Sequence, residues 1–209
     1  MGTRGQVSGW GSGGDTPDPH GSGPAAAGFM TKGIHDPTKY YYRRVYTDAV
    51  RLVDLVTTLN FVDRTRIALT GASQSGGIAI AVAALISGTR AVMPDVPLLS
   101  HFRRAVEATT EEPVTEITRY LAVHREVVEQ TFHTLSYFDG VNFAKRITAP
   151  ALFSVALMDG IVLPSTVFAA YNHLGSGEKQ IEVYAYNGHE GGQFMQWTRQ
   201  AAWLPRHLA

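Results

Sequence analysis

A short turn of small residues, GASQSGG at positions 71–77, connects two apolar segments and restricts the possible fold more than any other part of the chain. The segment before it, RIALT at 66–70, is short and apolar, as in a buried strand. The segment after it, 76–87, is apolar on nearly all sides, as in a buried helix. Small residues at the turn let a strand and a helix approach closely. We therefore predict a buried strand, a tight turn and a buried helix in succession.

The rest of the chain extends this alternation. Short apolar runs predict further strands at 91–96, 151–157 and 180–184, and spacings of three and four predict helices at 40–59, 165–174 and 191–203. The first 39 residues contain 10 Gly and 4 Pro, which favour turns over long helices or strands. Strands that alternate with helices favour a mostly parallel sheet with helices on both faces, so the expected fold class is α/β.

The segment 97–134 interrupts this pattern. It is more polar than its surroundings, and Val114, Ile117, Tyr120 and Leu121 follow a helical period. We interpret it as a helical insertion after the second strand, within a single domain at 1–209. It carries more apolar positions than a polar surface loop would, so we expect it to form a partner surface.

Composition and charge disfavour several functions. The chain has 18 Lys+Arg and 18 Asp+Glu, scattered rather than clustered, which disfavours nucleic acid and anionic membranes as partners. The longest nearly unbroken apolar run, 78–86, is less than half of the roughly 20 residues that span a bilayer. The first residues contain no apolar segment of signal-peptide length, so we expect a cytoplasmic protein. Cys is absent and seven of the eight His have no metal-ligand spacing or site context, so we expect no metal or other cofactor.

Ser73 occupies the position in the turn where a nucleophile would stand. The strained turn would project its hydroxyl above the sheet, and the backbone N–H of Gln74 would face a developing oxyanion. The motif is imperfect, because Ser75 stands where G-x-S-x-G has its last glycine. A glycine- and serine-rich turn that only packs is the alternative interpretation.

A serine hydroxyl needs a base, and the base needs a carboxylate that orients it. Asp159 follows the predicted strand at 151–157, and His189 follows the strand at 180–184 in a loop with glycine on both sides. The order Ser, Asp, His is that of the α/β-hydrolases, and open α/β sheets place their sites at the carboxyl edge. The alternatives are that Asp159 caps the helix behind Pro164 and that His189 is a surface residue.

Several stretches resemble the cephalosporin C deacetylase and acetyl xylan esterase family, the seventh carbohydrate esterase family of α/β-hydrolases. They are Arg4-Gly5-Gln6, GASQ at 71–74, His189-Glu190 and the longer runs GFMTKGI, YYYRRVYTDAVR, DVP, HFRRA, TLSYFDGVNFA, SVALMD and PSTVFAAYN. Together they cover essentially the whole chain. The resemblance implies that Ser73 is the nucleophile, Asp159 the orienting acid and His189 the base, with the N–H of Gln74 in the oxyanion hole.

The same resemblance implies supporting residues and partners. Arg4 and Gln6 would belong to a loop that supports the geometry of the site, and Gly71 and Glu190 would support it from the matching motifs. The implied substrate is a small acetylated molecule. Family members form ring-like hexamers, so the resemblance also implies a homo-oligomer.

The chain departs from the family pattern at several positions. It has Val7, Ala72 and Ser75 where the family has glycine, and Val162 where a cysteine is common. Family members also carry further chain before the Arg-Gly-Gln loop, including the first strands of the sheet and a tyrosine of the oxyanion hole. We therefore expect those strands to be absent and the strand at 66–70 to lie at the edge of the sheet.

Three functions are compatible with these observations. The first is a serine esterase that removes acetyl groups from acetylated sugars, xylo-oligosaccharides and cephalosporin C-like small esters, and the residue order and the resemblance favour it. The second is a truncated or inactive hydrolase that acts as a structural or oligomer-forming module. The third is a peptidase on the same scaffold.

Overall fold

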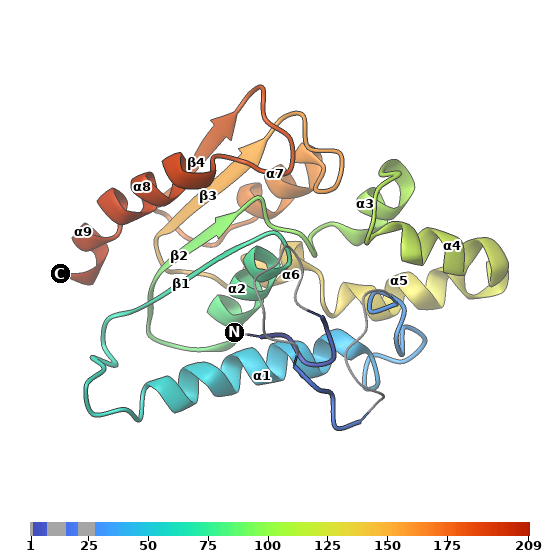
Figure 1. Cartoon of the computed structure of the whole chain (residues 1–209), viewed down its shortest axis with the longest axis horizontal. Helices are drawn as coiled ribbons and strands as arrows, with labels where there is room; N and C mark the ends of the chain where they lie inside the picture. The colour runs from blue at the N-terminus through green and yellow to red at the C-terminus, as the bar shows by residue number, and fades with distance from the viewer. Residues whose placement is uncertain (1, 8–15, 21–27) are drawn as a thin grey trace.

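The computed structural model describes residues 2–7, 16–20 and 28–209, and the statements below refer to these residues. They contain one four-stranded parallel sheet, whose strands pair in chain order (Figure 1). The strands are β1 (Ile67–Ala72), β2 (Thr89–Asp95), β3 (Ala151–Ala156) and β4 (Lys179–Tyr184). Each predicted strand is confirmed to within two residues at either end.

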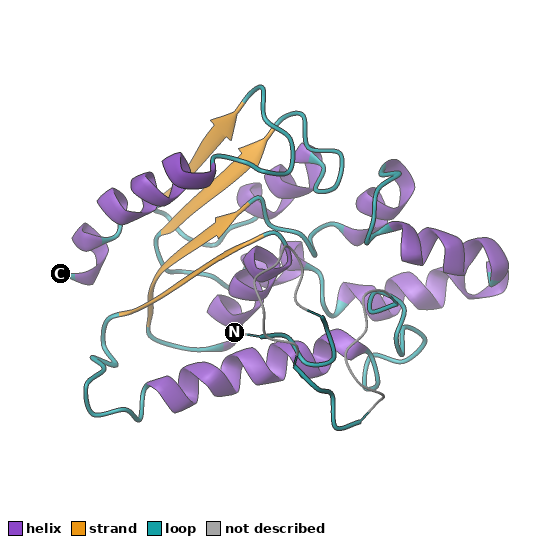
Figure 2. Cartoon of the chain, in the orientation of Figure 1, coloured by secondary structure: helices purple, strands orange, loops and turns teal. Residues whose placement is uncertain are grey.

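Helices come before, between and after the strands along the chain (Figure 2). The longer ones are α1 (Tyr41–Val56), α2 (Gln74–Leu85), α7 (Pro164–Asn172) and α8 (Gln193–Trp203), close to the predicted ranges. The segment 97–134 is helical as predicted, with α3 (Phe102–Ala108), α4 (Thr115–Val123), the 3₁₀ turn η1 (Arg125–Val127) and most of α5 (Val128–Ser136). Two short helices, α6 (Gly140–Ala144) and α9 (Pro205–Leu208), were not predicted, because segments this short cannot show a helical period.

The two faces of the sheet pack against different helices. On β2, the side chain of Val92 joins the core formed with α1, α2, α6 and α7. Its neighbours Ala91 and Met93 point to the opposite face, where they pack against Trp203 of α8. Side chains of a strand alternate between faces, so this division follows from the strand period. The predicted α/β arrangement with helices on both faces is confirmed.

The strand β1 lies at one edge of the sheet. Within the described ranges its one neighbouring strand is β2, and its residues are half-buried or exposed. The expectation of an edge position for 66–70 is therefore confirmed. A cavity of about 210 Å³ lies beside β1, and its lining includes Leu52 and Val53 of α1, Leu69 of β1 and Val82 of α2.

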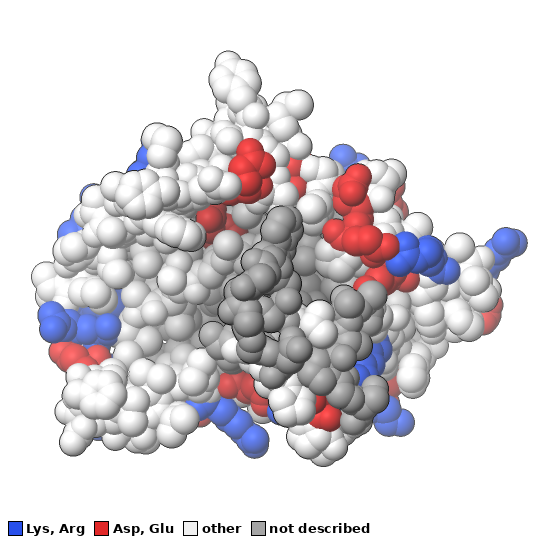
Figure 3. Space-filling view, in the orientation of Figure 1, with Lys and Arg blue, Asp and Glu red and all other residues white. Residues whose placement is uncertain are grey.

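Charged side chains form small groups of both signs on the face drawn in Figure 3. This agrees with the zero formal net charge of the chain. In the part of the chain that the structure describes, no helix combines the length and the apolar character needed to cross a bilayer.

Candidate active site

Ser73 lies in a sharp turn between β1 and α2. Its backbone angles are φ 53° and ψ −122°, a conformation that residues with a side chain rarely adopt. Backbone hydrogen bonds hold it: Ser73 N–H donates to the C=O of Asp95 at 2.9 Å, and Ser73 C=O accepts from the N–H of Gly77 at 3.1 Å and of Leu98 at 2.9 Å. The turn predicted at 71–77 is therefore present. Hydrogen bonds to Asp95 at the end of β2 and to Leu98 stabilise its strained backbone.

Two glycines make this turn possible. A Cβ atom on Gly71 would lie 2.5 Å from the carbonyl oxygen of Ser75, and one on Gly77 would overlap the carbonyl of Leu98. Larger residues at either position would push α2 away from its neighbours. Packing thus requires glycine at these two positions.

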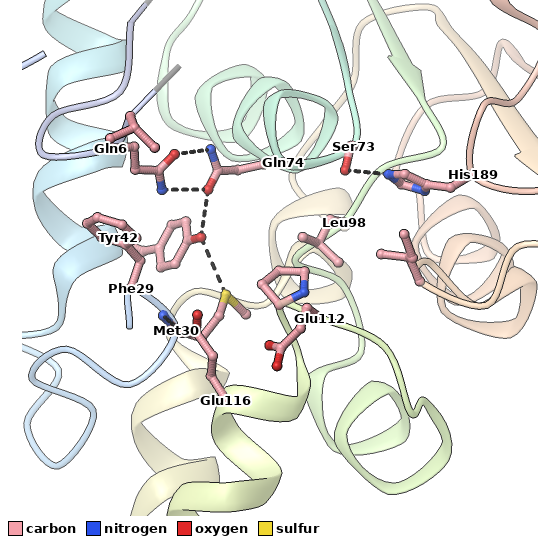
Figure 4. Close-up of a pocket in the computed structure, with 13 residues that line it drawn as sticks. Gln6, Phe29, Met30, Tyr42, Ser73, Gln74, Leu98, Glu112, Glu116 and His189 are labelled. Carbon is pink, nitrogen blue, oxygen red and sulfur yellow. Dashed lines mark hydrogen bonds between the residues drawn. The ribbon is translucent and has the colours of Figure 1, made fainter. Parts of the chain in front are cut away.

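The side chains of Ser73, His189 and Asp159 form a continuous series of hydrogen-bond contacts. His189 Nε2 lies 2.9 Å from Ser73 Oγ (Figure 4), and His189 Nδ1 lies 2.8 Å from Asp159 Oδ2. A carboxylate beside Nδ1 favours the tautomer with the proton on Nδ1, which leaves Nε2 free to accept the hydroxyl proton of Ser73. The structure therefore brings together the three residues that the chain order singled out.

Asp159 is held by its own turn. It is 3% exposed, and its Oδ1 accepts hydrogen bonds from the N–H groups of Ile161 at 2.9 Å and Val162 at 2.8 Å. The helix α7 begins after Leu163 without a side-chain cap from any described residue. The alternative interpretation, that Asp159 caps this helix, is wrong, because its oxygens bind the preceding turn and His189.

Gln74 is fixed on two sides. Its side-chain amide pairs with that of Gln6, with Nε2 of each residue 3.0 Å from Oε1 of the other, and Tyr42 donates its hydroxyl proton to Gln74 Oε1 at 2.8 Å (Figure 4). The backbone N–H of Gln74 lies in the first turn of α2, where N–H groups have no acceptor within the helix. This N–H is therefore available next to Ser73 for a negatively charged oxygen.

Arg4 connects the loop at 2–7 to α1. Its guanidinium makes a bidentate contact with Asp48, with Nε 2.5 Å from Oδ2 and Nη2 2.6 Å from Oδ1. The backbone carbonyl of Arg4 accepts a hydrogen bond from the hydroxyl of Tyr41. These contacts place the loop so that Gln6 reaches Gln74.

Glu190 shapes the loop that carries His189. Its Oε1 accepts hydrogen bonds from Asn187 Nδ2 at 3.0 Å and from the N–H of Gly188 at 3.2 Å. The hydrogen bond from Asn187 is the largest of the effects that lower the pKa of Glu190 below its usual value. Glu190 therefore acts on the backbone turn around His189.

A cavity of about 320 Å³ opens beside Ser73 (Figure 4). Apolar side chains line much of it: Phe29, Met30, Leu98 and Ile161. Sequence reasoning missed this set, because its members come from distant segments and share no local pattern.

In the described part of the chain, no group of three or more His, Asp or Glu side chains could hold a metal ion.

Besides Leu98, the segment 97–134 contributes Glu112, Pro113 and Glu116 to the lining of this cavity. Glu116 of α4 accepts hydrogen bonds from the N–H groups of Gly28 at 2.8 Å and Met30 at 2.9 Å. The segment that was expected to form a partner surface therefore also builds a wall of the cavity. Its residues Glu112 and Glu116 were not predicted as site residues.

Comparison with known proteins gives a family for this arrangement. The chain matches the family model described as "Acetyl xylan esterase (AXE1)" over residues 1–207. A curated relative, "Acetyl esterase Axe7A" of Xylanibacter ruminicola, is 27% identical over 195 residues, which cover 87% of this chain and 40% of that protein.

Solved structures agree with the family match. "Acetyl xylan esterase from Paenibacillus sp. R4" is 42% identical with a TM-score of 0.84, covering 90% of this chain and 61% of that one. Acetyl xylan esterase 1 from Thermoanaerobacterium sp. JW/SL YS485 is 34% identical with a TM-score of 0.81, covering 93% and 62%.

More distant structures agree in fold alone. They include a Pyrococcus horikoshii acylaminoacyl peptidase, with 17% identity and a TM-score of 0.57, and the α/β-hydrolase GrgF from a Penicillium species, with 16% identity and a TM-score of 0.59. The chain spans 61% and 62% of the two solved esterase chains and 40% of the curated relative. With an α/β-hydrolase fold and a family match over nearly its whole length, this chain belongs to the acetyl xylan esterase family.

Proposed function

We propose that this chain carries the active site of a serine esterase that removes acetyl groups from small acetylated substrates. The observation that supports this most strongly is the unbroken contact from Ser73 Oγ through the His189 ring to the buried Asp159 carboxylate. A serine at a strained strand-to-helix turn, with a base and an orienting carboxylate in contact, is the arrangement that acyl transfer requires.

In the first half of the proposed reaction, Ser73 Oγ attacks the carbonyl carbon of the acetyl group while His189 Nε2 takes its proton. Asp159 stabilises the positive charge on the imidazole, and the N–H of Gln74 donates to the negatively charged carbonyl oxygen. The bond to the leaving alcohol then breaks, and His189 returns the proton to the alcohol oxygen. An acetyl group remains on Ser73.

The second half reverses these roles. A water molecule attacks the acetyl carbonyl, and His189 takes its proton. The bond to Ser73 Oγ breaks, His189 gives the proton back to that oxygen, and acetate leaves. Side chains and a backbone N–H supply every step, so the proposed reaction needs no metal or other cofactor.

The size of the cavity beside Ser73 favours a small substrate. Its volume of about 320 Å³ is at the lower end of the range of ligand pockets, roughly 300 to 1,000 Å³. We propose acetylated sugars and xylo-oligosaccharides as the substrate class, with cephalosporin C-like esters as further candidates. The printed names of the solved relatives, acetyl xylan esterases, support the first of these.

A second candidate is an inactive hydrolase chain that serves as a structural or self-associating module. The strand β1 favours it, because an edge strand can pair with another chain. The apolar cavity beside β1 would add to such an interaction.

Hydrolysis of a chromogenic acetate ester by the purified chain separates the two candidates. The esterase proposal predicts activity that Ser73→Ala removes and that Ser87→Ala, at an exposed position after α2, retains. Reaction of a fluorophosphonate with Ser73, followed by mass spectrometry, tests the nucleophile without requiring turnover. If the chain neither hydrolyses the ester nor is labelled at Ser73, the result would favour the structural module.

A further inference from the structure

The end of β2 carries a buried carboxylate that the proposed reaction leaves unexplained. β2 lies between β1 and β3 and ends at Asp95, so this residue stands between Ser73 and the turn of Asp159. Asp95 is 5% exposed. Because a buried carboxylate loses its hydration, it costs stability unless other groups compensate it.

Asp95 stabilises the strained turn at Val96 through a side chain of the neighbouring strand β3. It accepts a hydrogen bond from the hydroxyl of Ser154, a fully buried residue of β3. Ser154 Oγ in turn accepts a hydrogen bond from the N–H of Val96 at 3.0 Å. Val96 has a φ of +37°, which is unfavourable for a β-branched residue. The series Asp95, Ser154, Val96 therefore holds the backbone in a conformation that it would not adopt alone.

This turn contacts the loop of His189. A Cβ atom built on Gly191 would lie 3.2 Å from Val96 Cγ1 and 3.5 Å from Asp95 Oδ1. The N–H of Gly191 donates to the C=O of Gly188 at 3.0 Å, which closes the turn that contains His189. The loop that carries His189 therefore packs against the end of β2.

Charge connects the same residues. Burial raises the pKa of Asp95, while the hydrogen bond from Ser154 and the charge of His189 oppose that rise. The other titratable or charged groups around this part of the site include Asp159, Glu190, Tyr184, Arg199 with its partner Glu182, and Glu112 and Glu116 across the cavity.

We propose that Asp95 is a positioning residue for His189, which supports its loop through Ser154 and Val96. Asp95 does not touch the reacting atoms in this proposal. Its consequences for catalysis rest on the esterase function proposed above, but its effect on the position of the His189 ring does not.

The test is the far-downfield proton NMR signal of His189 Nδ1–H in the 209-residue chain and in Ser154→Ala, which removes the hydroxyl that links Asp95 to Val96. A His189→Gln variant assigns the signal among the eight histidines. Release of the turn should let the loop of His189 move and broaden this signal. Where esterase activity is measurable, kcat should fall about tenfold with little change in KM.

Asp139→Asn is the control for a purely structural effect. Asp139 accepts hydrogen bonds from the N–H groups of His101, Phe102 and Val141, so its loss should lower stability and leave the Nδ1–H signal of His189 unchanged. Asp95→Ala removes the acceptor of the Ser154 hydroxyl instead. It should broaden the same signal, and this variant also serves if Ser154→Ala does not fold.

An unchanged Nδ1–H signal of His189 in folded Ser154→Ala or in folded Asp95→Ala would overturn the proposal. A broadened signal in a chain that hydrolyses no ester would support the role of Asp95 and count against the esterase function. The two proposals therefore fail in different experiments.

Discussion

The side-chain amides of Gln6 and Gln74 face each other in a reciprocal pair, with both N–O distances at 3.0 Å. This pair connects the N-terminal loop to the residue that follows Ser73 across 68 positions of sequence. Gln74 also carries the N–H that we propose for the oxyanion hole. The loop at 2–7, itself tied to α1 by Arg4 and Asp48, therefore contacts the residue that carries the proposed oxyanion donor.

The first prediction concerns this pair. Gln6→Ala removes both amide hydrogen bonds to Gln74, and we expect kcat for a chromogenic acetate ester to fall about tenfold, with a smaller change in KM. Gln130→Ala is the matched control, since Gln130 makes one exposed hydrogen bond, to the carbonyl of His35. Equal kcat values for Gln6→Ala and the wild type would show that the pair does not support the site.

The second prediction concerns the stability of Asp95→Asn. Burial raises the pKa of Asp95, so the folded protein holds this proton more tightly than the unfolded chain does. Ionisation of Asp95 therefore lowers the free energy of unfolding as the pH rises above about 4. Asparagine does not ionise, so the free energy of unfolding of Asp95→Asn relative to the wild type should increase as the pH rises above about 4.

Urea unfolding of both proteins at several pH values measures this difference. Asp139→Asn provides the comparison for loss of a carboxylate that binds backbone N–H groups at a helix start. A difference between Asp95→Asn and the wild type that stays constant or decreases with pH would contradict the assigned direction.

The third prediction concerns the wall of the cavity. Glu116→Ala leaves the N–H groups of Gly28 and Met30 without their acceptor, and the segment that carries Phe29 and Met30 should move. Hydrogen bonds to a charged group contribute about 1.5 to 3 kcal/mol to stability, so their loss should displace this wall of the cavity and weaken substrate binding. We therefore expect KM to rise about tenfold or more while kcat changes less. Glu126→Ala, in the exposed turn η1, is the control. A larger loss in kcat than in KM would assign Glu116 a different role.

The fourth prediction concerns self-association through the segment 97–134. Val123, at the end of α4, is 75% exposed, and a charge there should weaken an apolar contact between copies. We expect light scattering to show an oligomer for the wild type and a smaller species for Val123→Glu. Phe61→Glu, at a similarly exposed position outside this segment, should leave the oligomer intact. A monodisperse wild-type monomer at micromolar concentration would contradict the proposal.

Much of the fold could be predicted because its strands are local patterns. The run at 151–157 is short, apolar and bounded by turn residues, and the glycines of 71–77 define one kind of turn. Ser73, Asp159 and His189 could be singled out for a similar reason, since each follows a strand and parallel strands end at one edge of the sheet.

Other site residues gave no such signal. Tyr42 and Glu116 lie on helices whose period identifies buried positions but not which of them face a cavity. Asp95 ends a strand as the catalytic candidates do, but its role depends on contacts with Ser154 and Gly191, which come from distant parts of the chain. Such contacts exist only after the sheet has formed.

The central claim is that Ser73 and His189 act as one unit, and a double-mutant cycle on kcat tests it most directly. Ser73→Ala and His189→Ala are each expected to reduce kcat by as much as about 10⁶, because neither group activates the reaction without the other. The double variant should then be scarcely slower than either single one. Additive losses in the double variant, or a single variant that keeps more than a few per cent of wild-type activity, would contradict this account.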